Sequence, residues 1–284
     1  KFKTIAEYIS VGLTTCLLVF LHFRLWTENF SVPYNRGGDS DFHPIMVRTI
    51  QKTGWIFENP QLGAPKTSKI FDVPQGGDNL QWLVMKLLSY VFTVGETINV
   101  YFLLTYFFVS ICAYGAAKWY GLTRISSLVI AILYAFLPYH LYRGEGHLLL
   151  SMYCVIPLVI VYAYKSCTND YKLSKWKIFF FAIIISSLGA YYAIFSIMII
   201  SFSLLFSIFN KKYPVMKNQL WLVFASALVF LFNQAPTIIY RLANGENPSA
   251  AARQIADAEN FGLQITNMFG PRLDHRIHKL AEFA

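Results

Sequence analysis

Residues 5–26 read IAEYISVGLTTCLLVFLHFRLW, an almost unbroken apolar run that follows Lys1 and Lys3. A helix needs about 20 apolar residues to cross the hydrocarbon core of a bilayer, and this run has that length. Basic residues before a first span favour a cytoplasmic N-terminus. The stretch therefore predicts a membrane-spanning helix that runs outward from the cytoplasm.

The whole chain has the same apolar character. Of its 284 residues 56% are hydrophobic and only 14% are charged, with a mean hydropathy of +0.45. A soluble domain has about a quarter of its residues charged. Many of the basic residues behind the net charge of +9 stand in short loops between apolar runs, where they orient a membrane protein. The composition predicts an all-α integral membrane protein without a nucleic-acid partner.

The apolar runs and basic loops together predict about seven transmembrane helices. Residues 1–241 would form the transmembrane module, and residues 242–284 an external segment that we expect to be the start of a longer continuation. The expected spans are Ile5–Trp26, Thr97–Ala117, Ile125–Pro138, Leu148–Tyr164, two from Ile178–Asn210 divided within Ser186–Tyr192, and Leu220–Ile239.

A long external loop, residues 27–96, is expected after the first span. Within it, Pro44–Trp55 reads as a short helix because proline suits the first helical turn. Asn79–Phe92 is apolar but only 14 residues long, which favours an interfacial helix over a span. Loops of this length are usually functional or disordered, and the apolar residues along this one indicate a packed loop.

The loop opens on a polar string, Arg36–Pro44, which reads RGGDSDFHP. Alternating carboxylates such as Asp39 and Asp41 can bind one divalent cation, Mg²⁺ or Mn²⁺, or one can act as a general base that the other orients. Gly37 before them lets the backbone approach a ligand closely. The alternative is an ordinary solvated turn, since Gly, Asp and Ser are common turn residues.

The predicted topology collects the titratable groups on the outer side, while the inner loops carry mainly lysine. Segregation of this kind in a membrane protein indicates chemistry or binding at the outer face. All six histidines fall on that side: His22, His43, His140, His147, His275 and His278.

A first span followed by an outer loop with an Asp-x-Asp pair resembles the GT-C glycosyltransferases, most closely their bacterial YfhO-like or uncharacterised members. The resemblance rests on the string Gly38–His43, the long first loop with its short helices, and the closely spaced fifth and sixth spans. It implies an integral enzyme of the bacterial cytoplasmic membrane. Such an enzyme moves a sugar from a polyprenyl-phosphate carrier to a glycan, lipid or protein hydroxyl on the external face. It also implies that Asp39 deprotonates the acceptor hydroxyl and that Asp41 assists it or helps to bind a metal.

Further candidates come from side-chain chemistry alone. Arg143, Glu145 and His147 alternate in a loop after the third span, where the guanidinium, helped by the imidazole, can hold a departing phosphate. The alternative is an interfacial ion pair between Arg143 and Glu145. His43 is a further candidate beside the aspartates.

Two polar residues near the end of the last span complete the set. Gln234 can hydrogen-bond sugar hydroxyls, and Arg241 is a second candidate for binding phosphate. The alternatives are that Gln234 satisfies backbone freed by Pro236 and that Arg241 reaches lipid headgroups.

Two other functions compete with glycosyl transfer. A non-catalytic scaffold or binding subunit of envelope polysaccharide assembly would tolerate alanine at Asp39 and Asp41. A transporter of lipid-linked sugars would place polar groups at the membrane midplane, whereas the centres of these spans are almost purely apolar.

Overall fold

The computed structural model describes residues 2–71, 77–245, 247 and 278–282. Its contacts divide the chain into a unit of residues 1–245 and a unit of residues 246–284. The second unit contributes one described helical turn, α13 (His278–Ala281). Most of the predicted external segment 242–284 lies outside the described residues.

The first unit is mostly helical, with one pair of two-residue antiparallel strands inside the long loop. In chain order its elements are α1 (Phe2–His22), η1 (Gly38–Asp41), α2 (Phe42–Thr53), β1 (Glu58–Asn59), β2 (Ser68–Lys69), α3 (Asn79–Leu88), α4 (Val94–Tyr120), α5 (Arg124–Ala135), α6 (Pro138–Arg143), η2 (Leu148–Ser151), α7 (Ile156–Asn169), α8 (Lys175–Ser187), α9 (Ala190–Phe209) and α10 (Tyr213–Asn244).

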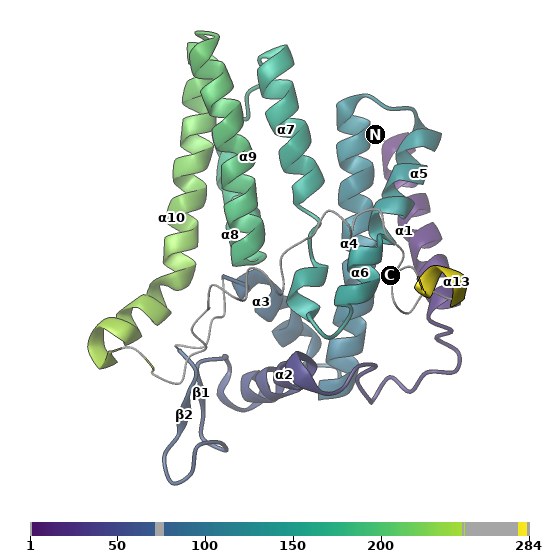
Figure 1. The fold of residues 1–284 in the computed structure, drawn as a ribbon, viewed down its shortest axis with the longest axis vertical. Coiled ribbons are helices and arrows are strands. Elements are labelled where there is room, and N and C mark those ends of the chain that lie inside the picture. Colours follow the sequence, from purple (N-terminus) through teal and green to yellow (C-terminus); the bar gives the residue numbers. More distant parts are fainter. Residues whose placement is uncertain (1, 72–76, 246, 248–277, 283–284) are drawn as a thin grey trace. The chain divides into compact units, whose positions relative to one another are not determined.

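The chain passes back and forth between two ends of this unit (Figure 1). The long-loop end carries residues 23–71, 77–93, 136–155 and 188–189, and therefore includes η1, α2 and α3. The short-loop end carries residues 121–123, 170–174 and 210–212. The two predicted short helices of the long loop are present as α2 and α3, which begin close to the expected positions.

Helix α4 is the centre of the packing, and it contacts α1, α5 and α7. Its buried residues run from Gly95 near one end to Ala117 near the other. Against α1, the ring of Phe107 fills the space beside Gly12, and Thr15 donates a hydrogen bond of 2.9 Å to Ser110. Small residues and buried hydroxyls at the contact are typical of helices that pack together in a membrane, where backbones must approach closely.

Five helical stretches within the described residues are long and apolar enough to cross a membrane. They fit the predicted all-α membrane protein, but they do not match the prediction of seven spans, which is wrong in its count. The five are Thr4–His22, Val94–Tyr120, Arg124–Arg143, Ala190–Phe209 and Tyr213–Asn244.

The miscount arises at α7 and α8, the fourth and fifth expected spans. With 14 and 13 residues these helices rise only about 20 Å at 1.5 Å per residue. Residues 148–155 of the expected fourth span form η2 and an irregular segment, and α7 starts only at Ile156, with proline in its first turn. Helix α8 ends at Ser187, before Gly189 with φ 132°, so the expected hairpin within Ser186–Tyr192 is present.

Candidate functional site

The first part of the long loop is fixed by one amide in α4. Asn99 is fully buried, and its Nδ2 donates hydrogen bonds of 2.8 Å to the carbonyls of Phe30 and Val32. Its Oδ1 accepts from the backbone N–H of Tyr34 at 3.3 Å. An amide buried at a helix position must be paired to offset its desolvation, and here its partners are loop backbone groups. The side chain therefore holds residues 30–34 against the start of α4.

The polar string folds into the single turn η1. Gly37 has φ 90°, a conformation that strongly favours glycine, and its N–H donates to Oδ1 of Asp41 at 3.0 Å. The Ser40 hydroxyl donates to the Gly37 carbonyl at 2.7 Å. Asp41 thus closes its own turn, while Asp39 lies in the same turn with a side chain that is 74% exposed.

Asp39 reaches across to the loop between α6 and η2. Its Oδ2 lies 3.3 Å from Nδ1 of His147, whose side chain is 42% exposed. These two residues are 108 positions apart and belong to the two segments that the sequence singled out. An exposed pair of this kind contributes at most about 1 kcal/mol to stability, so the fold does not depend on the contact. Both groups remain accessible to a substrate.

Glu145, two residues before His147, also joins the two loops. It is only 3% exposed, its Oε2 accepts from the N–H of Asn35 at 2.9 Å, and its Oε1 has no hydrogen-bond partner among the described residues. Burial raises the pKa of Glu145 to about 7, although backbone hydrogen bonds from Asn35 and Tyr34 oppose the shift. The carboxyl group can therefore gain or lose a proton near neutral pH.

His43 lies at the start of α2 and is 5% exposed. Burial lowers its pKa to about 4, and the imidazole of His147 adds to the lowering, while the Ser40 backbone and the Asp39 carboxylate oppose it. Its Nδ1 is buried without a hydrogen-bond partner in the described part of the chain. The imidazole is therefore neutral at pH 7.

The structure thus gathers four of the predicted residues into one place. We call Asp39, His43, Glu145 and His147 the loop cluster. Arg143 belongs to the same loop, and its guanidinium lies 5.5 Å from the centre of the Tyr139 ring. The alternative Arg143–Glu145 ion pair does not occur among the ion pairs of the described residues.

Two predicted residues lie elsewhere in the unit. Gln234 packs against Gly77 at the end of the long loop, and Arg241 lies in the last turn of α10. The ring of Tyr240 stacks on Phe71 at 5.0 Å, which holds this part of α10 against the loop. Figure 1 shows the C-terminal end of α10 away from the start of α2, and therefore away from the loop cluster.

The predicted cation would be bound by Asp39 and Asp41 without a third protein carboxylate or imidazole, because no three His, Cys, Asp or Glu side chains of the described residues are placed to hold a metal together. Asp39 is paired with His147, and Oδ1 of Asp41 is occupied by the Gly37 N–H. Two carboxylates alone supply few of the roughly six oxygen ligands that Mg²⁺ requires. Asp39 and Asp41 would therefore supply part of a cation's ligand shell, with water or phosphate oxygens supplying the rest.

The sequence interpretation missed Asn99, Tyr34 and Asn35. Asn99 carried a usable signal, since a polar side chain inside an apolar span usually has a specific partner. Tyr34 and Asn35 gave no such signal in the sequence, because each takes part through its backbone N–H. The phenol oxygen of Tyr34 is in addition buried without a partner in the described region.

The loop cluster combines an exposed carboxylate–imidazole pair with a buried acid and a buried neutral imidazole. This arrangement can accept a proton at Asp39 and pass or hold one nearby, which is the chemistry of general acid–base catalysis. Comparisons of the chain with protein-family models, with curated proteins and with solved structures found no match.

Proposed function

We propose that this protein is a membrane glycosyltransferase of the GT-C type, with the loop cluster as its active site on the external face. The donor would be a sugar on polyprenyl phosphate, and the acceptor a hydroxyl of a glycan, lipid or protein. The N-terminus would be cytoplasmic, and the membrane a bacterial cytoplasmic membrane. The main support for this proposal is the contact between Asp39 and His147. It joins the segment predicted to contain the general base with the segment predicted to bind the departing phosphate.

In the proposed reaction, Asp39 takes the proton of the acceptor hydroxyl as its oxygen attacks the anomeric carbon. The bond from that carbon to the phosphate oxygen breaks, and polyprenyl phosphate leaves. His147 orients the Asp39 carboxylate through the 3.3 Å contact. Arg143, four residues before it, would stabilise the negative charge on the departing phosphate by bidentate hydrogen bonds. No step in this scheme requires a metal.

The site also suits transfer at a membrane surface because its polar groups lie at one end of the apolar helices. The side chains of Asp39 and His147 are accessible to a soluble or lipid acceptor, whereas those of Glu145 and His43 are buried. Holding acceptor and donor together in such a site removes much of the entropic cost of a two-substrate reaction.

The test is transfer from undecaprenyl-phosphate hexoses and pentoses by the full chain in proteoliposomes. Asp39→Asn should lower the rate by about 100-fold to 10,000-fold, the usual contribution of a general base. Asp41→Asn should lose much less, because its amide oxygen can still accept from the Gly37 N–H. Glu58→Gln, an exposed carboxylate of the same loop, is the matched control.

Near-wild-type transfer by folded Asp39→Asn protein would remove the base role. Absence of transfer by the wild-type chain with every donor, together with normal folding, would favour the scaffold function.

A further inference from the structure

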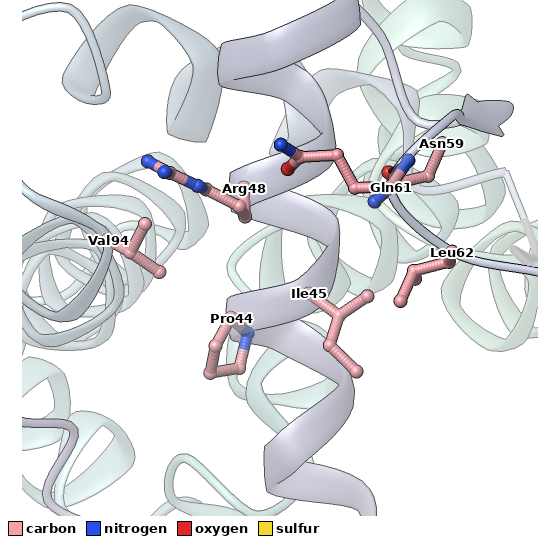
Figure 2. A pocket seen from close by; sticks show the side chains of 7 residues that line it. All are labelled: Pro44, Ile45, Arg48, Asn59, Gln61, Leu62 and Val94. Atoms are coloured by element: carbon pink, nitrogen blue, oxygen red, sulfur yellow. Dashed lines mark hydrogen bonds between the residues drawn. The ribbon is translucent and has the colours of Figure 1, made fainter. Parts of the chain in front are cut away.

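A cleft of about 360 Å³ lies beside α2, on the part of the long loop that the proposed reaction does not use. Pro44, Ile45 and Arg48 of α2 form one wall, Gln61 and Leu62 of the loop form another, and Val94 of α4 closes it (Figure 2). This volume is at the lower end of the range of small-molecule sites, about 300–1,000 Å³.

The cleft has a polar end and an apolar end. Figure 2 shows the guanidinium of Arg48 and the amide of Gln61 toward one end, and Pro44, Ile45 and Leu62 toward the other. Asn59 also lines the cleft, but its amide nitrogen donates to the Thr49 hydroxyl at 2.7 Å and is used by the fold. A ligand that fits this lining is an amphiphile with an anionic head.

The charge of Arg48 has no carboxylate partner among the ion pairs of the described residues. Its Nη1 makes a long hydrogen bond of 3.4 Å to Gln51, a neutral side chain. The carboxylate of Glu96, near the cleft, is engaged by the N–H and hydroxyl of Thr93 as a helix cap. The guanidinium therefore remains available to an anion.

The position of the cleft agrees with the level of lipid headgroups. Val94 is the first residue of a helix long enough to span a membrane. Ile45 and Leu62 are exposed, as are Tyr90 and Val91 just before α4. Exposed apolar side chains beside cations at the end of a span are typical of the membrane interface, where arginine meets phosphate.

We propose that this cleft binds one anionic phospholipid of the surrounding membrane. The headgroup phosphate would accept hydrogen bonds from Arg48 and Gln61, and the first part of an acyl chain would lie along Pro44, Ile45, Leu62 and Val94. A guanidinium binds phosphate bidentately, which makes it a stronger and more directional anchor than an ammonium. The lipid is distinct from the sugar donor, so the proposal does not depend on glycosyl transfer.

The test is a titration of delipidated full chain in neutral detergent with dioleoylphosphatidylglycerol, followed by native mass spectrometry. Arg48→Gln should weaken binding about tenfold or more, the effect of losing a charged hydrogen-bond pair. Lys52→Gln, one turn further along α2 and outside the cleft, is the matched control and should bind like the wild type. Leu62→Asn should also weaken binding, since it removes part of the apolar wall.

Three results would overturn the proposal. The first is equal affinity of Arg48→Gln and wild type, and the second is an equal loss in Lys52→Gln. The third is competition by soluble glycerol phosphate at the concentration of the lipid, because the apolar wall would then contribute nothing. A separate control concerns the headgroup: equal binding of dioleoylphosphatidylcholine would likewise overturn the proposal, because that lipid has no net charge. Thermal unfolding of each variant checks that the fold is retained.

Discussion

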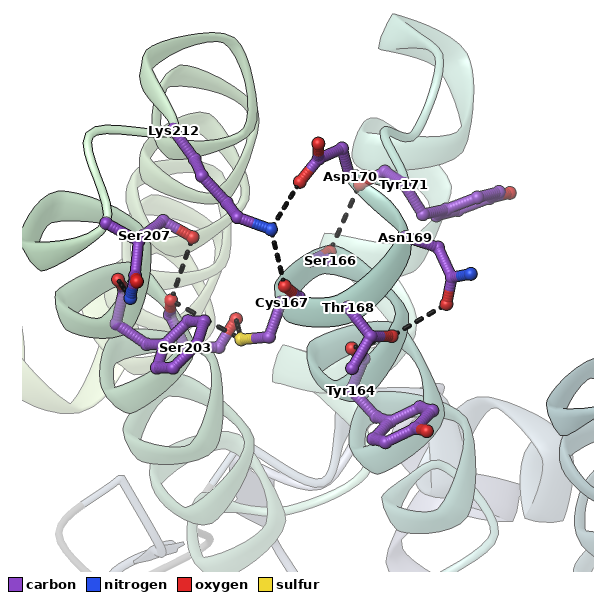
Figure 3. Close-up of polar contacts among 12 residues, drawn as sticks. Tyr164, Ser166, Cys167, Thr168, Asn169, Asp170, Tyr171, Ser203, Ser207 and Lys212 are labelled. Carbon is purple, nitrogen blue, oxygen red and sulfur yellow. Dashed lines mark hydrogen bonds and ion pairs between the residues drawn. The ribbon is translucent and has the colours of Figure 1, made fainter.

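The two ends of the helical unit treat their polar groups differently. At the short-loop end, Lys212 Nζ donates to the Asp170 carboxylate and to the Cys167 carbonyl, each at 2.7 Å, and Ser166 donates to the Tyr171 carbonyl at 3.1 Å (Figure 3). At the long-loop end, more of the buried atoms have no partner among the described residues: they belong to Tyr34, His43, Trp82, Thr97 and Glu145, whereas Gln219 near the start of α10 is the corresponding case toward the short-loop end.

The difference suggests a way to tell polar groups that stabilise the fold from candidates for function. A buried donor or acceptor without a partner costs about 1–3 kcal/mol, so a fold keeps few of them. The groups around Lys212 and Asp170 are paired and join α7 to the turn before α10. Of the unpaired atoms at the long-loop end, that of His43 lies near Asp39 and His147, and that of Glu145 lies in the same loop as His147. We therefore expect substitutions at the two ends to affect different measurements.

The largest expected effect is on catalysis, at His147. His147→Ala removes the group that orients Asp39, and a carboxylate out of position by about 1 Å can lower the rate about 100-fold. We expect kcat for sugar transfer to fall by this order while KM changes little, and His147→Asn to retain part of the rate. Transfer at the wild-type rate by His147→Ala would place the reactive group elsewhere.

The second effect is on the pH dependence of stability, at Glu145. Its pKa rises from 4.5 to about 7 on folding, so the folded state binds more protons than the unfolded state between these values. Stability should therefore fall as the pH rises from 4.5 to 7, by about 3 kcal/mol in total. Glu145→Gln cannot ionise, so it should become more stable relative to the wild type across the same window, as measured by chemical unfolding in detergent.

Asp78 and His43 also contribute to the pH dependence of stability in this range, so their contributions must be separated from that of Glu145. Burial also raises the pKa of Asp78 to about 7, which adds to the fall, and lowers that of His43 to about 4, which opposes it. Comparing Glu145→Gln with the wild type at each pH cancels both contributions. Glu58→Gln, an exposed carboxylate in β1, should show no such trend. A flat difference between Glu145→Gln and wild type would mean that Glu145 is solvated.

The sequence was sufficient for the helical membrane fold class, though not for the number of spans. Hydropathy and basic loops predicted helical spans, the two short helices of the long loop and the hairpin within Ser186–Tyr192. The span count failed because an apolar run does not say where its helix begins. Pro157 marks the beginning of α7, because proline is favoured in the first turn of a helix. Pro138 similarly begins α6, where the sequence interpretation ended the third span.

For the site, the sequence singled out the residues but not the geometry between them. The segments around Asp39 and His147 were chosen from their polar composition, yet their contact depends on long-range packing. Asn99 holds the first loop against α4, and Glu145 pairs with backbone beside Asn35. Neither contact follows from local periodicity, because one partner in each is a backbone group. The same packing leaves Gln234 and Arg241 in α10, away from the cluster.

The third effect is on the free energy of unfolding, and it concerns the contact of Asp78 with Gly189 at the long-loop end. Asp78 accepts from Gln81 Nε2 at 3.1 Å, and a Cβ on Gly189 would lie 2.8 Å from its Oδ1. Gly189 also has φ 132°, which an alanine rarely adopts. We expect Gly189→Ala to lower the free energy of unfolding by about 1–3 kcal/mol. Gly121→Ala, also at positive φ but with no atom near its Cβ, measures the backbone part alone. Equal losses in both would mean that Asp78 moves away freely.

The smallest effect is expected at the short-loop end, in Lys212→Met. The side chains of Lys212 and Asp170 are 26% and 63% exposed, and an ion pair so open to solvent contributes about 1 kcal/mol or less. Loss of the hydrogen bond to the Cys167 carbonyl adds little, because water can replace the donor at such a site. Chemical unfolding should therefore show a small loss, with sugar transfer unchanged. Added salt separates the contribution of the ion pair from that of the hydrogen bond. Screening weakens the ion pair of the wild type, whereas Lys212→Met has no ion pair at this position to weaken. A loss well above 1 kcal/mol that is independent of salt would mean that lipid covers this end, and the pair would then be desolvated rather than exposed.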